Sequence, residues 1–117
     1  MMKIRIKVGD KTLTATLADS ARSRDFVSLL PLTLTLKNYG ATEKISDLPR
    51  KFSVKDAPAG HDPDAGDITY YAPWGTLAIF RKDFRYSDGL IKLGKIDGAV
   101  AALDTSEELE ATIELIK

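Results

Sequence analysis

The aromatic residues that could line a binding site are concentrated in one short stretch, GDITYYAPWGTLAIF (66–80). Side chains alternate between the two faces of a strand, so Tyr70 and Tyr71 would point in opposite directions, one into a core and one toward a cleft. Trp74 follows a proline at a turn, where a large ring with an N–H donor often borders a cleft. We predict that Tyr71 and Trp74 line a site. The alternative for these aromatic residues is plain packing in the core.

The sequence offers few other residues for nucleophilic or metal chemistry. It contains no cysteine, which excludes disulfides, thiolate catalysis and thiolate metal ligands. Its one histidine, His61, lies between acidic residues in AGHDPD, but this loop lacks the ligand spacing of a divalent-metal site. No GxxxxGK[ST] phosphate loop is present. We therefore predict no metal, no cofactor and an exposed loop position for His61.

The composition indicates an ordinary globular chain. The 117 residues suit one domain, 1–117, and 44% hydrophobic with 29% charged residues is typical of soluble proteins. The 17 basic and 17 acidic residues balance, which argues against non-specific binding to nucleic acid or to an anionic membrane. Neither a signal peptide nor a window approaching the ~18 apolar residues of a membrane span is visible, so we expect a cytoplasmic protein.

Alternation of apolar and polar residues predicts many short strands. KIRIKV and TLTATL form an opening hairpin, and a helix over about 20–30 then ends at Pro31. Further strands are expected over 32–40, 76–80 (central, and buried on both faces) and 111–117, where a helical pattern is the alternative. The segment 55–67 is predicted to be an exposed, mobile loop, and Gly94 marks a bulge or a close approach. Seven or eight such strands suggest a barrel or a sandwich.

The order of these elements resembles a cyclophilin-type barrel. The helix segment DSARSRDFVSLLP, the strand WGTLAIF and the segment GLIKLGKIDGAVAALD carry the resemblance, the last over 15 residues of matched glycine and apolar spacing. Nearly the whole chain is similar to a group of small prokaryotic cyclophilin-like proteins of unassigned function. The resemblance implies a mainly β, closed barrel with one or two short helices.

The residues that would catalyse prolyl isomerisation are mostly missing. The resemblance implies an arginine in a Phe-His-Arg motif, and the nearest candidate is Arg50 in LPRKF, with no histidine beside it. The Gln-Phe-Phe triplet of the isomerases corresponds to Leu77, Ala78 and Ile79, and the chain has no glutamine. Arg50 could instead hold a carboxylate or phosphate bidentately, or be an ordinary surface arginine.

These observations lead to a hypothesis about function and a set of site residues. We predict a binding module whose aromatic and apolar cleft takes a small molecule or an extended peptide, with Arg50 as its anionic anchor. The alternative is a peptidyl-prolyl isomerase with a degenerate active site. A third hypothesis is a component of a larger assembly in which the cleft takes the loop of a protein partner, and a homodimer is also left open. The predicted ligand-binding residues are Arg50, Tyr71, Trp74, Phe80, Phe84 and Glu43.

Overall fold

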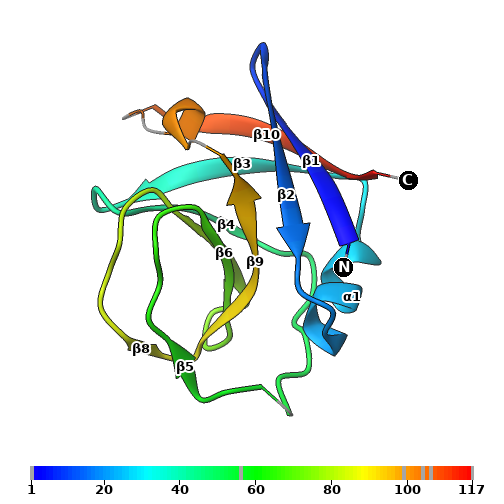
Figure 1. Cartoon of the computed structure of the whole chain (residues 1–117), viewed down its shortest axis with the longest axis vertical. Helices are drawn as coiled ribbons and strands as arrows, with labels where there is room; N and C mark the ends of the chain where they lie inside the picture. Colours follow the sequence, from blue (N-terminus) through cyan, green and yellow to red (C-terminus); the bar gives the residue numbers. More distant parts are fainter. Residues whose placement is uncertain (1, 56, 99, 104, 106, 117) are drawn as a thin grey trace.

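A closed antiparallel barrel dominates the computed structural model, which describes residues 2–55, 57–98, 100–103, 105 and 107–116 (Figure 1). Within these residues the barrel order is β1-β10-β3-β4-β7-β6-β9-β2. Its strands are β1 (Met2–Val8), β2 (Lys11–Leu17), β3 (Leu32–Tyr39), β4 (Glu43–Asp47), β6 (Asp67–Tyr71), β7 (Thr76–Phe80), β9 (Leu90–Asp97) and β10 (Leu109–Ile116). The predicted mainly β, closed-barrel architecture is confirmed.

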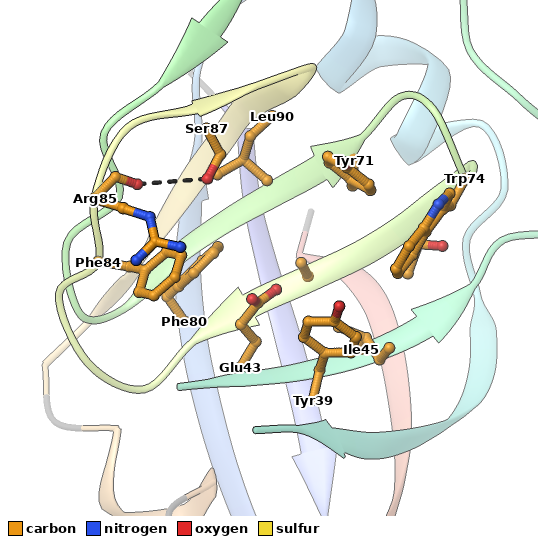
Figure 2. Close-up of a pocket in the computed structure, with 12 residues that line it drawn as sticks. Tyr39, Glu43, Ile45, Tyr71, Trp74, Phe80, Phe84, Arg85, Ser87 and Leu90 are labelled. Atoms are coloured by element: carbon orange, nitrogen blue, oxygen red, sulfur yellow. Dashed lines mark hydrogen bonds between the residues drawn. The ribbon is translucent and has the colours of Figure 1, made fainter. Parts of the chain in front are cut away.

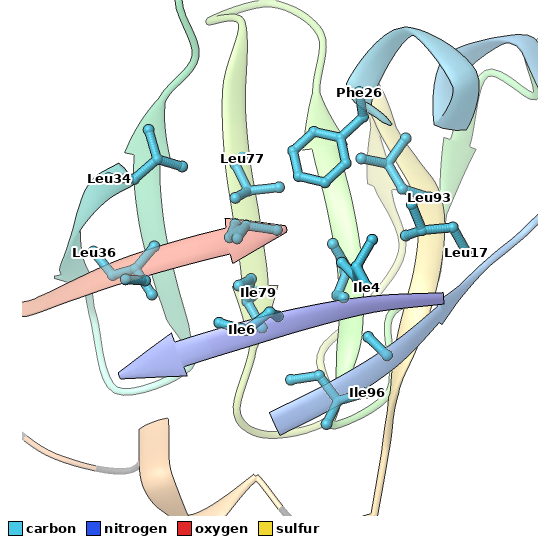
Figure 3. Packing of buried hydrophobic residues seen from close by; sticks show 14 of the residues in the cluster. Ile4, Ile6, Leu17, Phe26, Leu34, Leu36, Leu77, Ile79, Leu93 and Ile96 are labelled. Carbon is cyan, nitrogen blue, oxygen red and sulfur yellow. The ribbon is translucent and has the colours of Figure 1, made fainter. Parts of the chain in front are cut away.

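The barrel interior is filled by the apolar side of the alternating strands. Ile4 and Ile6 of β1 are completely buried, as are Leu77 and Ile79 of β7. Figure 3 shows these side chains converging from strands that are far apart in the sequence. Each such side chain contributes about 1.5–3 kcal/mol through removal from water, which makes this cluster the main source of stability.

One end of the barrel is covered by the helix α1 (Ala21–Val27) (Figures 1 and 3). Ser20 caps it by accepting a hydrogen bond from the Ser23 N–H at 3.1 Å, and Ser23 Oγ donates to the Leu93 carbonyl of β9 at 3.0 Å. Phe26 enters the core. The helix is shorter than the predicted 20–30, because the chain tightens into a turn after Val27 before it reaches Pro31.

The strand β9 passes very close to β2 at Gly94. A Cβ at this position would lie 2.7 Å from the Leu17 Cα, so only glycine fits. The pairing of β6 with β9 also shifts by one residue here, since Ile68 pairs with Gly94 and Thr69 with Lys92. The sequence predicted a bulge or a close approach at Gly94, and the structure has the two features together.

The loop predicted over 55–67 is more ordered than expected, whereas the last predicted strand is confirmed. The loop 55–67 contains β5 (Gly60–His61), which pairs with β8 (Ser87–Asp88) in a small separate sheet, and it ends at the completely buried Asp67. The segment near residue 100 forms a 3₁₀ turn, η1 (Ala101–Leu103). The last predicted element is a strand, β10, although Lys117 lies outside the described residues. In the described part of the chain, no helix is long and apolar enough to cross a membrane.

Candidate functional site

A cleft of about 330 Å³ lies on the outer face of the barrel, over β4 and β7 (Figure 2). Strand β7 is buried on both faces, as predicted: Leu77 and Ile79 face the barrel interior, whereas Ala78 and Phe80 form the floor of the cleft. The remaining lining residues are Tyr39, Glu43, Ile45, Tyr71, Trp74, Thr76, Phe84, Arg85, Ser87 and Leu90.

Three aromatic rings surround one end of the cleft. Trp74 contacts Tyr71 edge to face, with ring centroids 5.1 Å apart and planes at 89°, and it contacts Tyr39 at 5.7 Å and 73°. Trp74 is 55% exposed and Tyr39 is 50% exposed, so these rings present apolar surface to solvent instead of filling a core. Contiguous exposed aromatic surface of this kind is typical of binding sites.

The position of Trp74 follows from the turn between β6 and β7. Gly75 adopts φ +67°, and its N–H donates to the Tyr71 carbonyl at 3.0 Å, which closes the turn. Gly89 supports the turn from the other side, because its Cα packs so closely that an added Cβ would lie 2.8 Å from the Pro73 Cδ. These contacts place the backbone of Trp74 at the edge of the cleft.

The opposite end of the cleft carries a second aromatic pair and a cation. Phe80 and Phe84 stack with centroids 6.3 Å apart, and the Arg85 guanidinium carbon lies 4.8 Å above the Phe84 ring. Arg85 was not among the predicted site residues; the signal that could have found it is its place between two aromatic residues, Phe84 and Tyr86, whose ring faces attract a cation. Figure 2 shows Arg85 and Phe84 at the end of the cleft away from Trp74.

Glu43 is the carboxylate of the cleft. It begins β4, pairs in register with Phe80, and points its side chain between the two aromatic ends (Figure 2). Burial raises the pKa of the Glu43 carboxyl above its usual value. No hydrogen bond or ion pair joins this carboxylate to any other residue that the structure describes.

The two neighbouring tyrosines of YYAPW separate as the alternation predicts. Tyr70 is completely buried, and its hydroxyl accepts a hydrogen bond from the Phe52 N–H at 3.0 Å, whereas Tyr71 lines the cleft. Five of the six predicted site residues therefore come together around one cleft: Glu43, Tyr71, Trp74, Phe80 and Phe84. Whether they bind a ligand stays a prediction.

Arg50 is not among the residues that line the cleft. Its Nη2 donates to Ser28 Oγ at 2.8 Å and lies 3.8 Å from the Asp25 carboxylate, at the end of α1. Its guanidinium carbon is 5.5 Å from the centre of the Phe52 ring. The structure does not bring Arg50 together with the aromatic residues of the cleft, because its side chain turns to the end of α1 while the next residue, Lys51, packs against Gly75 before β7.

A second cluster of charges lies around Asp67. His61 Nε2 is 2.8 Å from Asp67 Oδ2, and Lys92 Nζ is 3.3 Å from Asp67 Oδ1. The His61 side chain is only 25% exposed, which corrects the expected exposed loop position, since the β5–β8 pairing draws the loop onto the barrel. A smaller cavity of about 220 Å³ adjoins His61 and Lys92.

The pKa of Asp67 reflects this environment. Burial alone would raise the pKa, but hydrogen bonds from the Asp64 N–H and from His61, together with the charge of Lys92, hold it below its usual value. The ionised Asp67 carboxylate of β6 therefore links the loop that carries His61 to Lys92 of β9. No group of three or more metal-ligating side chains occurs among the residues that were described.

Comparisons with known proteins agree with the architecture. The model of the cyclophilin-like family matches residues 6–114. The solution structure of a hypothetical protein from Archaeoglobus fulgidus has a TM-score of 0.72 with 16% identity, covering 98% of this chain and 95% of that chain, which shows a shared fold. No curated protein matches the sequence. The family model matches most of the chain, and the barrel architecture agrees with it. This chain therefore belongs to the cyclophilin-like family.

Proposed function

We propose that the chain is a binding module whose cleft over β4 and β7 takes a small molecule or an extended peptide. The observation that carries the proposal is the pair of half-exposed rings, Trp74 and Tyr39, standing over an apolar floor. Exposed aromatic rings lose little conformational freedom when a ligand covers them, and they bury a large area on binding.

The size and lining of the cleft support the same proposal. Its volume of about 330 Å³ falls at the lower end of the range of ligand pockets, roughly 300–1,000 Å³. Aromatic and aliphatic walls that carry a set of polar groups are the usual composition of such pockets, and here the polar groups are Glu43, Arg85 and the hydroxyl groups of the lining tyrosines, Thr76 and Ser87. An extended peptide in this cleft would come from a partner protein.

The experiment that tests this proposal uses ligand screening by amide chemical shifts. A library of small molecules and short peptides is titrated into the ¹⁵N-labelled protein, and Trp74, the one tryptophan of the sequence, reports in parallel by fluorescence. We expect shifts confined to the cleft residues. Substituting Ala78→Phe would fill the floor and should abolish them.

A matched control separates the cleft from exposed aromatic surface in general. Tyr86 is 54% exposed, which is nearly the exposed fraction of Trp74, but Tyr86 does not line the cleft. We expect Trp74→Ala to weaken binding and Tyr86→Ala to leave it unchanged. Equal losses in both variants, or the absence of any ligand that shifts cleft resonances, would contradict the proposal.

A further inference from the structure

We propose that the Trp74 end of the cleft binds an organic cation, an ammonium group that carries alkyl substituents. The binding element is an aromatic box formed by Tyr39, Tyr71 and Trp74, with the Glu43 carboxylate beside it. The proposal rests on the binding function of the same cleft and names the chemical class of its ligand.

The first argument is the arrangement of the rings. The Trp74 ring stands nearly perpendicular to Tyr71, at 89°, and steeply inclined to Tyr39, at 73°, so the rings cannot simply stack on one another. They come from three places in the chain, the ends of β3 and β6 and the turn before β7, and they surround one end of the cleft (Figure 2). Ring faces carry negative potential, and the half-exposed Trp74 and Tyr39 rings keep ring surface that these edge-to-face contacts leave uncovered, to which a cation is attracted.

The second argument is the isolated carboxylate. Glu43 is partly buried beside Phe80 and lacks a hydrogen-bonding or ion-pairing partner in the part of the chain that the structure describes. Half-buried anions are normally paired, because leaving water costs them free energy. A cationic ligand between Glu43 and the rings would supply the missing charge.

The third argument concerns the type of cation. Apart from the hydroxyl groups of Tyr39, Tyr71 and Thr76, the wall beside Glu43 is hydrocarbon, and it offers fewer oxygen atoms than the roughly six to eight that a hard metal ion takes. An alkylated ammonium is weakly hydrated, and its methyl groups contact apolar walls favourably. Arg85 stands at the other end over Phe84, so its charge does not occupy the aromatic box.

The experiment compares choline with 3,3-dimethylbutan-1-ol, which has the same shape but carries carbon in place of the charged nitrogen. Both are titrated into the ¹⁵N-labelled protein, with Trp74 fluorescence as a second readout. We expect choline to shift the resonances of Tyr39, Tyr71 and Trp74, and to bind on the order of tenfold or more tightly than the neutral alcohol.

Variants assign the effect to the box. Glu43→Gln keeps the shape of the side chain and removes its charge, so we expect a several-fold loss of choline affinity with no change for the neutral alcohol. Trp74→Leu should remove choline binding while keeping an apolar wall. Glu110→Gln, an exposed carboxylate on β10, is the matched control and should bind choline as the unmodified protein does.

The outcomes separate this inference from the proposed function. Equal affinity for choline and the neutral alcohol, or choline binding that Glu43→Gln leaves intact, would overturn the cation inference while the cleft remained a binding site. If choline causes no shift but other library members do, the cation inference again fails alone. If no compound shifts the cleft residues, both proposals fail.

Discussion

His61 Nε2 lies 2.8 Å from Asp67 Oδ2, so a carboxylate with no exposed surface holds the part of the loop around His61 against the barrel. The same carboxylate accepts a hydrogen bond from the Asp64 N–H at 2.9 Å and pairs with Lys92 of β9. Through the β5–β8 pairing, this loop also supports the segment that carries Arg85 and Ser87 into the cleft. The stability of the cleft therefore depends on a buried ion outside it.

We expect Asp67→Asn to destabilise the protein by roughly 2–4 kcal/mol, because it leaves Lys92 without its buried partner and weakens the contact with His61. Urea denaturation at neutral pH measures the loss. Asp62→Asn, an exposed aspartate of the same loop, is the control and should change stability by less than about 0.5 kcal/mol. A loss equally small for Asp67→Asn would show that the carboxylate does not hold the loop.

The pH dependence of this effect has a definite sign. The pKa of Asp67 in the folded protein lies below the value of 3.8 for an unperturbed aspartate. Its contribution to stability is therefore complete above about pH 3.8 and is lost as the pH falls through the folded pKa. We expect the stability difference between the unmodified protein and Asp67→Asn to narrow in that acidic range, as followed by urea denaturation. A difference that widened on acidification would contradict the assignment.

Glu43 should behave in the opposite way. Burial raises the pKa of its carboxyl, so the charged form opposes folding above the usual pKa of 4.5. We expect Glu43→Gln to shift the urea midpoint upward at neutral pH, while it weakens choline binding. Such a gain of stability with a loss of binding is typical of a functional residue. A lower midpoint would mean that Glu43 has a stabilising partner in the fold.

We expect Gly89→Ala to disturb the turn that carries Trp74. The substitution places a Cβ 2.8 Å from Pro73 at a residue with φ +80°, which should cost about 1–3 kcal/mol and move the Trp74 ring. Tryptophan fluorescence and thermal unfolding measure the two effects. Gly9→Ala, which also has positive φ but open space around it, should lose stability without changing the fluorescence. Identical spectra for both variants would argue against contact between Gly89 and the turn.

Prolyl isomerase activity is not expected from this cleft. Arg50 is engaged with Ser28 near the helix, and of the positions 77–79 Ala78 is the residue that lines the cleft. We expect a proline tetrapeptide to isomerise in the presence of the protein at the uncatalysed rate, over roughly tens of seconds or longer. Acceleration that Arg50→Ala removes would contradict this expectation and would restore the isomerase alternative.

Much of the barrel could be predicted from the sequence, because strand alternation is a local signal. The alternation in KIRIKV predicts that Ile4 and Ile6 face the interior, without knowledge of the strands they pair with. By the same rule, Tyr70 faces the core and Tyr71 faces the cleft. The end of α1 was harder to place, since its last turn changes hydrogen-bond pattern before Pro31 is reached.

The identity of the residues that share a site depended on tertiary structure. In the sequence, Arg50 and Trp74 look equally suited to line a cleft, yet in the structure the Arg50 side chain is held by Ser28 at the end of α1. The position of Arg85 at the cleft and the contact between His61 and Asp67 both depend on the β5–β8 pairing, which joins segments more than 20 residues apart. Alternation along one strand determines which face a side chain occupies, but only the pairing of distant segments determines what it meets there.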